Sequence, residues 1–277
     1  MKCFAIILSG GTGTRMNMDI PKQYIEVADR MIITESIRPF IESGLISDIQ
    51  IVADEMWQDK ITDEYHVLSE EFLGELSLAV SEFGGGTEDE SRLYKFHGFS
   101  SPGDNRQLSI YNSLIDIRGD ISDGDIVIIH DAARPLVTVG MIDTCITAVC
   151  GDNKTSGQDN VETGRNIDGK TIIHDGAMPV LPMKDTVYLS EDGKSIASLI
   201  NRDKLFAGQA PEVFVYGKYL EACEKLLPDK IMDIRGSTEP AIMAGMDIVM
   251  IPGDEGNFKI TTREDLERYK EKATNAS

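Results

Sequence analysis

The chain has 277 residues and a formal net charge of −20, which argues against nucleic acid or an anionic membrane as partner. With 41% hydrophobic and 6% aromatic residues, it can bury one large α/β core. No apolar run approaches the length of a membrane span, and no signal-peptide layout precedes the first apolar segment, so we expect a cytoplasmic protein. No CxxC spacing occurs, and we expect reduced core residues at Cys3, Cys145, Cys150 and Cys223.

The first motif is a glycine-rich turn. It follows the apolar run Cys3 to Leu8, which we predict to be the buried first strand of a parallel sheet. The string LSGGTGTRMNMDIPKQY, residues 8–24, places Gly10, Gly11 and Gly13 directly after that strand. Successive backbone N–H groups in such a turn can approach an anion because no Cβ blocks them. The alternative is a tight strand-to-loop turn that binds nothing.

Two basic residues in the same string suit an anionic ligand. Arg15 and Lys22 are the only cations between Lys2 and Arg30, and both are usual partners of phosphate. The string has neither the GxxxxGK[ST] of a P-loop nor the third glycine of a dinucleotide fingerprint. Pro21 stands where a phosphate-binding helix would continue, so we expect an extended loop folded over a polyphosphate.

Strands and helices are predicted to alternate along the chain, which implies a twisted, mainly parallel sheet with helices on both faces. Acidic, glycine-rich residues 83–91 are predicted to be a surface loop. Polar residues 151–170 are predicted to be a long surface loop or a disordered insertion. The predicted helices are 34–43, 56–73 and 106–117, and the predicted strands are 48–53, 94–98, 126–130 and one near Met178.

A projecting hairpin is predicted at residues 187–200. Two short β-prone runs there flank Asp192 and Gly193, a pattern typical of a two-residue turn. Its apolar side chains would be exposed unless something covers them. We therefore expect a partner subunit to pack against it.

The second motif, GDNRQLSIYNSL, begins just before a predicted helix. Gly103 and Asp104 precede the helix, and its first turn carries Arg106 and Ser109. A ligand there would meet backbone amides, a hydroxyl and a carboxylate together, which are groups that can distinguish cytosine from uracil. The alternative is that Asp104, with Asn105, only caps the helix.

The third motif, HDAARP at residues 130–135, follows the predicted strand 126–130 at the edge where open parallel sheets bind ligands. Asp131 is the best metal candidate, because Mg²⁺ prefers one or two carboxylates together with substrate phosphates and water. The alternative is a strand-end aspartate paired with Arg134. His130 is expected to be structural rather than a base.

The remaining motifs lie in the last third of the chain. PMKDTVY at residues 182–188 and NRDKLFAGQAPEVF at residues 201–214 flank the predicted hairpin. GDEGNFKITTREDLE, residues 253–267, contains a capping box from Thr262 to Asp265 that predicts the start of a C-terminal helix.

Taken together, GGTGTRM and PKQY resemble the signature of nucleotidyltransferases that join a sugar or polyol phosphate to a nucleoside triphosphate. The PKQ element narrows the resemblance to the cytidylyltransferases that act on 2-C-methylerythritol 4-phosphate or ribitol 5-phosphate. It implies a Rossmann-like three-layer α/β/α domain spanning residues 1–277. It also implies a projecting β-arm at about 183–212, insertions at about 70–100 and 151–175, and a homodimer formed through the arm.

The resemblance also implies roles for individual residues. The substrates would be CTP and a small polyol phosphate, with Mg²⁺ as cofactor bound at Asp131. The implied acceptor-binding residues are Arg134, Thr186 and Arg202. The implied catalytic residues are Arg15, Lys22, Arg202 and Lys259. The implied nucleotide-binding residues are Leu8, Ser9, Gly10, Gly11, Gly13, Gly103, Asp104, Arg106 and Ser109.

Two places depart from the family pattern. The family usually has QTPQ where this chain has QAPE, with Ala210 and Glu212, and residues 236–243 (GSTEPAIM) replace a more acidic stretch. We favour ribitol 5-phosphate as acceptor because GGTGTRM, Trp57 and the GQxP of residues 208–211 resemble that branch. The alternatives are 2-C-methylerythritol 4-phosphate, a non-catalytic nucleotide-binding relative, and a sugar nucleotidyltransferase that uses UTP or dTTP.

Overall fold

The computed structural model describes residues 1–11, 18, 20–83, 94–151, 165–167 and 170–276. Within these residues an eight-stranded sheet has the order β12-β9-β13-β6-β1-β4-β5, and β14 pairs with β9. Its strands are β1 (Cys3–Leu8), β4 (Asp48–Val52), β5 (Phe96–Ser100), β6 (Ile126–Asp131), β9 (Gly176–Pro182), β12 (Phe206–Gly208), β13 (Glu212–Val215) and β14 (Ile248–Pro252).

The middle strands of the sheet run parallel. β1 pairs in parallel with β4 and β6, and β4 pairs in parallel with β5. β12 and β13 join the sheet antiparallel. The apolar sequence of β1, CFAIIL, is buried over its first five residues, as expected for a parallel strand covered on both faces. The α/β prediction and the buried first strand are confirmed.

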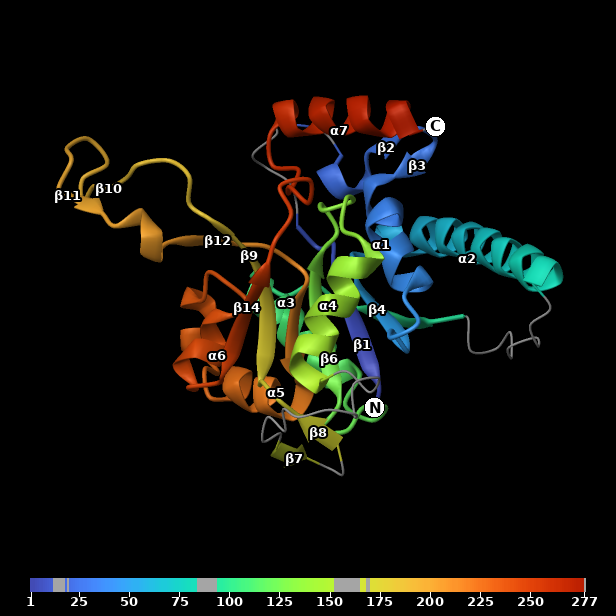
Figure 1. Cartoon of the computed structure of the whole chain (residues 1–277), viewed down its shortest axis with the longest axis horizontal. Coiled ribbons are helices and arrows are strands. Elements are labelled where there is room, and N and C mark those ends of the chain that lie inside the picture. The colour runs from blue at the N-terminus through green and yellow to red at the C-terminus, as the bar shows by residue number, and fades with distance from the viewer. Residues whose placement is uncertain (12–17, 19, 84–93, 152–164, 168–169, 277) are drawn as a thin grey trace.

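Helices cover both faces of the sheet (Figure 1). Side chains of α1, α2 and α4 form a core with one face, and side chains of α3, α5 and α6 form a core with the other. A three-layer domain results. The helices are α1 (Ile32–Glu42), α2 (Glu55–Phe83), α3 (Arg106–Asp116), α4 (Val139–Cys150), α5 (Tyr216–Glu224), α6 (Glu239–Met243) and α7 (Arg263–Ala276).

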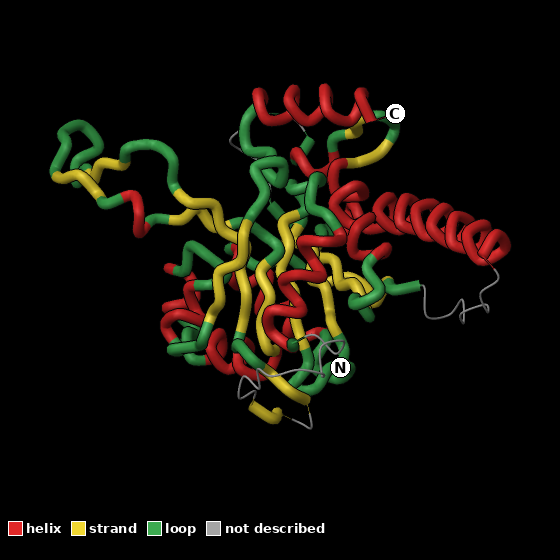
Figure 2. Tube along the Cα trace, viewed as in Figure 1, coloured by secondary structure: helices red, strands yellow, loops and turns green. Residues whose placement is uncertain are grey.

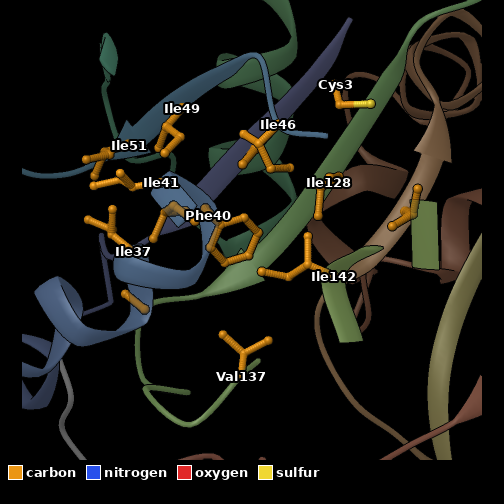
Figure 3. Close-up of a cluster of buried hydrophobic side chains, with 14 of the residues drawn as sticks. Cys3, Ile37, Phe40, Ile41, Ile46, Ile49, Ile51, Ile128, Val137 and Ile142 are labelled. Carbon is orange, nitrogen blue, oxygen red and sulfur yellow. The ribbon is translucent and has the colours of Figure 1, made fainter. Parts of the chain in front are cut away.

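The larger core lies on the first face. Apolar side chains from α1, β4, β6 and α4 converge there (Figure 3). Phe40 of α1 is fully buried and lies beside Ile128 of β6 and Ile142 of α4. Burial of a side chain of this size contributes roughly 1.5–3 kcal/mol, so this cluster fixes α1 and α4 against the strands that end at the candidate site.

A buried lysine binds the backbone carbonyls at the C-terminal end of α1. Lys95, just before β5, is 6% exposed. Its Nζ donates to the carbonyls of Ile41 and Ser43, each at 2.6 Å. These carbonyls lack partners within the helix, and a cation is favoured at the negative end of the helix dipole. Burial nevertheless lowers the pKa of Lys95 to about 8.

The C-terminal helix begins as the capping box predicts. The Asp265 amide donates to Thr262 Oγ1 at 3.2 Å, and the Thr262 amide donates to Asp265 Oδ2 at 2.9 Å. α7 starts at the next residue, Arg263. Leu266 and Tyr269 of this helix pack with Ile260 and the start of α1. The C-terminal helix α7 is thereby fixed above the carboxyl ends of the parallel strands (Figure 1).

Other element boundaries differ from the predicted ones. α2 continues to Phe83, ten residues beyond the predicted end, and the predicted strand 94–98 lies at Phe96–Ser100. Most of the predicted loop 83–91 lies outside the described residues. Within the predicted loop 151–170 and just after it, β7 (Arg165–Ile167) and β8 (Lys170–Ile172) form a short antiparallel pair.

An arm, residues 183–205, projects from the sheet between β9 and β12 (Figure 1). Its short strands β10 (Val187–Leu189) and β11 (Ser198–Ile200) pair antiparallel, and most of the arm is loop (Figure 2). The hairpin is confirmed, but the two-residue turn is wrong. Residues 190–197 connect the strands, because Asp192 Oδ1 accepts from the amides of Lys194 and Ser195 and forms a wider turn.

Further short elements complete the fold. None of the helices in the described part of the chain has the length and apolar composition needed to cross a bilayer. The cysteines are free, as predicted, and Cys3, Cys145 and Cys223 are buried, whereas Cys150 is only half-buried. The remaining elements are the pair β2 (Glu26–Val27) and β3 (Arg30–Met31) and the 3₁₀ turns η2 (Lys22–Tyr24), η4 (Arg202–Lys204) and η5 (Lys230–Asp233).

Candidate active site

The candidate site lies where β1, β6 and β4 end. Leu8 and Asp131 are register partners at the carboxyl ends of β1 and β6. The next residue, Ser9, is buried, and its amide donates to the Val52 carbonyl at the end of β4 at 3.0 Å. Loops that leave parallel strands at this edge converge. The glycine-rich turn and HDAARP therefore start side by side.

Two residues of PKQY, Gln23 and Tyr24, hydrogen-bond to the glycine-rich turn. Gln23 Nε2 donates to the carbonyls of Ser9, at 2.5 Å, and Gly11, at 2.7 Å. The Tyr24 hydroxyl donates to the Ser9 carbonyl at 3.0 Å, and its ring stacks on Trp57 at 4.2 Å. With its carbonyls engaged from one side, the turn can direct N–H groups to the other side.

Gln23 supports the glycine-rich turn, and the sequence analysis did not single it out. It is 4% exposed, and its two bonds are to backbone atoms, which no side-chain pattern reveals. Its place inside PKQY was the available signal. Gly13 and Arg15, both predicted for this turn, lie outside the described residues.

The second motif packs directly against the glycine-rich turn. A Cβ on Gly10 would stand 2.6 Å from Pro102 Cβ, and a Cβ on Gly103 would stand 2.9 Å from the Ser109 amide nitrogen. Both positions therefore require glycine. The Gly103 amide donates to Ser109 Oγ at 3.0 Å, and that hydroxyl donates to the Asn105 carbonyl at 2.9 Å. Ser109 thus holds the loop in shape.

The start of α3 is capped by Asn105. Its side chain accepts from the Leu108 amide at 2.7 Å, so capping does not use the neighbouring Asp104. The Asp104 carboxylate is exposed to solvent. The alternative that Asp104 and Asn105 cap the helix is therefore confirmed for Asn105 and wrong for Asp104, whose carboxylate is accessible to a ligand at this loop.

Three cations surround Asp131. Its Oδ1 accepts from Arg106 Nη2 at 3.1 Å, and its Oδ2 accepts from Lys259 Nζ at 2.9 Å. Arg134 Nε lies 3.5 Å from the same Oδ2. We call these four residues the Asp131 cluster. The cluster brings together the second motif, HDAARP and the NFKITT of residues 257–262, which lie apart in the sequence.

The three cations of the cluster strongly favour the ionised form of Asp131. Burial alone would raise the pKa of Asp131, but the charges of Arg106, Lys259 and Arg134 hold that pKa well below its usual value. Burial lowers the pKa of the adjacent His130 to about 3. His130 is thus neutral at physiological pH and is a structural residue, as expected.

A fourth cation lies next to the cluster. Lys22 Nζ donates to the Ile260 carbonyl at 2.5 Å, and the Ile260 amide donates to the Ala133 carbonyl at 2.9 Å. Lys22 and Lys259 are thereby brought to one place although they lie far apart in the sequence. Cations concentrated in this way can attract a polyphosphate despite the chain's net charge of −20.

The QAP segment supports the loop that carries Lys259. Gln209 Nε2 donates to the Asp254 carbonyl at 2.8 Å, and Asn257 Nδ2 donates to the Ala210 carbonyl at 2.7 Å. Arg134 Nη1 donates to the Asn257 carbonyl at 2.7 Å. This loop is therefore fixed on two sides.

The arm residues are not brought to the cluster within one chain. Arg202 and Thr186 lie on the arm, which extends away from the sheet (Figure 1). Arg202 Nη1 donates to the Lys184 carbonyl at 2.7 Å, and Thr186 is exposed. In this structure the two residues therefore lie apart from the Asp131 cluster.

The donor chemistry of Asp131 suits Mg²⁺ in a limited way. Among the described residues, no group of three or more His, Cys, Asp or Glu side chains is arranged to hold a metal. A single anionic carboxylate suffices when substrate phosphates and water supply the other ligands. Both oxygens of Asp131 already accept from cationic side chains, so a Mg²⁺ bound there with a polyphosphate would share this carboxylate with Arg106 and Lys259. Asp131 does not fit a metal held by protein alone.

Comparison of the whole structure shows the fold. A 2-C-methyl-D-erythritol 4-phosphate cytidylyltransferase from Francisella tularensis superposes with a TM-score of 0.67 at 19% identity, covering 97% of this chain and 98% of that one. A 4-diphosphocytidyl-2C-methyl-D-erythritol synthase from Anaerococcus prevotii gives 0.68 at 18% identity, covering 99% and 96%.

Sequence comparison shows the family. A curated 2-C-methyl-D-erythritol 4-phosphate cytidylyltransferase from Rubrobacter xylanophilus is 31% identical over 265 residues, 95% of this chain and 90% of the relative. A ribitol-5-phosphate cytidylyltransferase from Streptococcus pneumoniae serotype 2 is 28% identical over 269 residues, 95% of each. The family model described as 2-C-methyl-D-erythritol 4-phosphate cytidylyltransferase matches residues 3–91 and 158–271. The chain belongs to this family and is a nucleotidyltransferase of the cytidylyltransferase class.

Proposed function

We propose that the enzyme transfers CMP from CTP to a polyol phosphate, releases pyrophosphate and forms a CDP-alditol. The observation that carries this proposal is the Asp131 cluster with the adjacent Lys22. It gathers cations beside a glycine-rich turn whose carbonyls Gln23 engages. Such a site can hold the triphosphate of a nucleotide against a second anionic substrate.

The reaction needs no general base. The phosphate of the acceptor is already largely anionic, with a second pKa near ~6. One of its oxygens attacks the α-phosphorus of CTP, and the bond from that phosphorus to the bridging oxygen of pyrophosphate breaks. The enzyme has to align two polyanions and stabilise the charge of the transition state. Lys22, Lys259 and Arg15 are proposed for that task.

Other residues would bind rather than react. Leu8, Ser9, Gly10, Gly11 and Gly13 are proposed to bind the triphosphate. The Ser9 amide already donates to the Val52 carbonyl, so the N–H groups proposed to meet the phosphates are those of the three glycines. Gly103, Asp104, Arg106 and Ser109 are proposed to contact the cytidine side of CTP. Asp131 is proposed to hold Mg²⁺, which neutralises phosphate charge when bound.

We favour ribitol 5-phosphate as the acceptor. Relatives named for methylerythritol and for ribitol phosphates have similar identity to this chain, 31% and 28%, so the preference rests on GGTGTRM, Trp57 and GQxP. 2-C-Methyl-D-erythritol 4-phosphate is the second candidate, since the family model carries that description. Arg134 would meet the acceptor phosphate, together with Thr186 and Arg202 from a partner subunit.

A pyrophosphate-release screen tests the proposal. CTP and UTP are each offered with ribitol 5-phosphate, 2-C-methyl-D-erythritol 4-phosphate and other polyol phosphates. We expect CTP to be preferred by at least about a hundredfold in kcat/KM, because the wrong base leaves buried polar groups unpaired. Equal use of CTP and UTP would show that residues 103–109 do not distinguish cytosine. No release with any pair would favour a non-catalytic relative.

A further inference from the structure

Glu212 is the residue that departs from the family pattern and yet lies close to the Asp131 cluster. It begins β13 and is 9% exposed. A carboxylate buried to this degree is costly unless cations or donors compensate it. Its surroundings therefore show which groups compensate the charge of a glutamate at this position.

The sheet register directs Glu212 and Asp131 to the same side. Glu212 is the antiparallel partner of Ile129 on β6, and Asp131 lies two residues further along that strand. Cross-strand partners share a face, and so do residues two apart on one strand. Both carboxylates therefore face α3, whose first residue is Arg106.

Arg106 spans the two carboxylates. Its Nη2 lies 3.1 Å from Asp131 Oδ1 and 3.8 Å from Glu212 Oε1. Although burial alone would lower the pKa of Arg106, these two carboxylates raise it. Arg106 is thus held from two directions, whereas a neutral glutamine at position 212 would leave Asp131 as its only carboxylate partner in this group.

The other oxygen of Glu212 is also engaged. Thr238 Oγ1 donates to Glu212 Oε2 at 2.6 Å. Thr238 precedes α6 at its N-cap position, but its side chain makes no capping bond. Its hydroxyl therefore bonds to Glu212 rather than to the helix, and it also lies 3.4 Å from Met178 Sδ. Thr238 lies in residues 236–243, the second stretch that departs from the family pattern, so the two departures contact each other.

We propose that Glu212, anchored by Thr238, is a positioning residue that holds the Arg106 guanidinium in place at the nucleotide-binding loop. This inference rests on the proposed function, in which Arg106 contacts CTP. Glu212 then does not repel an anionic substrate, since its charge is used internally. It limits the orientations of Arg106 before CTP arrives, and such pre-organisation improves binding.

The first test needs no substrate. Arg106→Met should lower the thermal unfolding temperature, because two neighbouring buried carboxylates lose their shared cation. Adding Glu212→Gln should restore part of that loss. Non-additive changes of this kind measure the coupling of the two residues. Additive changes in the two variants would overturn the inference.

The second test measures CTP. In calorimetric titrations Glu212→Gln should raise the Kd for CTP roughly tenfold. KM for CTP should rise in parallel, with kcat and KM for the acceptor nearly unchanged, as for loss of a contact made equally in ground and transition states. Thr238→Val should act in the same direction, and Thr238→Ser should behave as wild type. The control is Glu221→Gln, which removes an exposed ion pair to Lys225 on α5.

The outcomes separate the two proposals. Unchanged CTP affinity in Glu212→Gln, in a wild-type enzyme that releases pyrophosphate from CTP, overturns the positioning role and leaves the proposed function standing. A wild-type enzyme that neither binds nor turns over CTP overturns both. If Glu212→Gln lowered both kcat and the thermal unfolding temperature but left the affinity for CTP unchanged, Glu212 would have only a structural role.

Discussion

The Asp131 cluster and the arm differ in what holds them in place. The cluster sits at the ends of core strands, and its side chains bond to backbone or side chains of segments distant in sequence. The arm makes mostly local contacts, such as Arg202 to the Lys184 carbonyl, and exposes apolar side chains. One region is preformed by the fold of a single chain. The exposed apolar side chains of the arm are typical of a surface that binds another protein.

The base of the arm connects the two regions. Lys184 forms an ion pair with Glu255, and Glu255 lies in the loop that carries Lys259. The Met183 amide donates to the Leu205 carbonyl at 3.0 Å, which closes the arm where it leaves the sheet. The arm is therefore fixed at its base.

The largest expected effect tests the preformed region. Lys22→Ala should lower kcat by about 10²–10³, because it removes a charge that stabilises the transition state. Steady-state kinetics and thermal unfolding are measured together, and the fold should be retained. The control is Lys60→Ala, which removes an exposed lysine paired with Glu26. Near wild-type turnover in Lys22→Ala would remove this loop from the catalytic machinery.

The next effect asks whether the arm completes the site of a neighbouring chain. Arg202→Ala and Lys22→Ala should each be nearly inactive alone. Mixed together, they should recover about a quarter of the wild-type rate per chain, because half of the dimers would be mixed and each would hold one intact site. Proven subunit exchange without recovery would show that Arg202 does not complete the site of the neighbouring chain.

A smaller effect concerns association through the arm. Ile196 and Leu199 are 69% and 65% exposed, and replacing both with Asp should shift the protein from dimer to monomer in light scattering. Charges buried in an apolar interface cost several kcal/mol of association. Leu45→Asp, at a 42% exposed position away from the arm, is the matched control. A wild-type monomer would contradict the shared-site hypothesis directly.

The smallest effect concerns the scaffold under the preformed region. The pKa of Lys95 is lowered in the folded state, to about 8, from an ordinary value of 10.5. Between these two values the unfolded chain binds more protons, so the free energy of unfolding should rise with pH, by roughly 1 kcal/mol for each pH unit. Below pH 8 the penalty for burying the charged group is fully present.

Chemical denaturation from pH 7.5 to 10 measures this slope. Other groups titrate in the same range, so the informative quantity is the difference between wild type and Lys95→Met, which should lose the rise attributable to Lys95. Lys60→Met controls for removal of a surface charge. An identical pH slope in wild type and Lys95→Met would show that burial does not disfavour the charged lysine.

Sequence patterns predicted the elements whose cause is local. The apolar run of β1 and the capping box of Thr262 and Asp265 depend on neighbouring residues, and both occur where expected. The turn at Asp192 was mispredicted because its side chain bonds two amides further along and widens the turn. A propensity rule for Asp-Gly pairs contains no such bond.

Long-range contacts could not be predicted in the same way. Motifs and the family resemblance selected Arg106, Asp131 and Lys259 one by one, but nothing in the sequence says that Asp131 Oδ2 accepts from Lys259. The roles of Gln23 and Glu212 depend on a backbone carbonyl of another loop and on sheet register. Such partners become visible only when the topology is known.

The separation of Asp131 and Lys259 along the chain has a consequence for synthesis. Lys259 lies 128 residues after Asp131, so a growing polypeptide can form the central parallel strands well before this cation leaves the ribosome. During that interval the buried aspartate has only Arg106 and Arg134 beside it. Because Lys259 follows every strand of the sheet along the chain, the phosphate-binding charge would be completed only after that residue has left the ribosome.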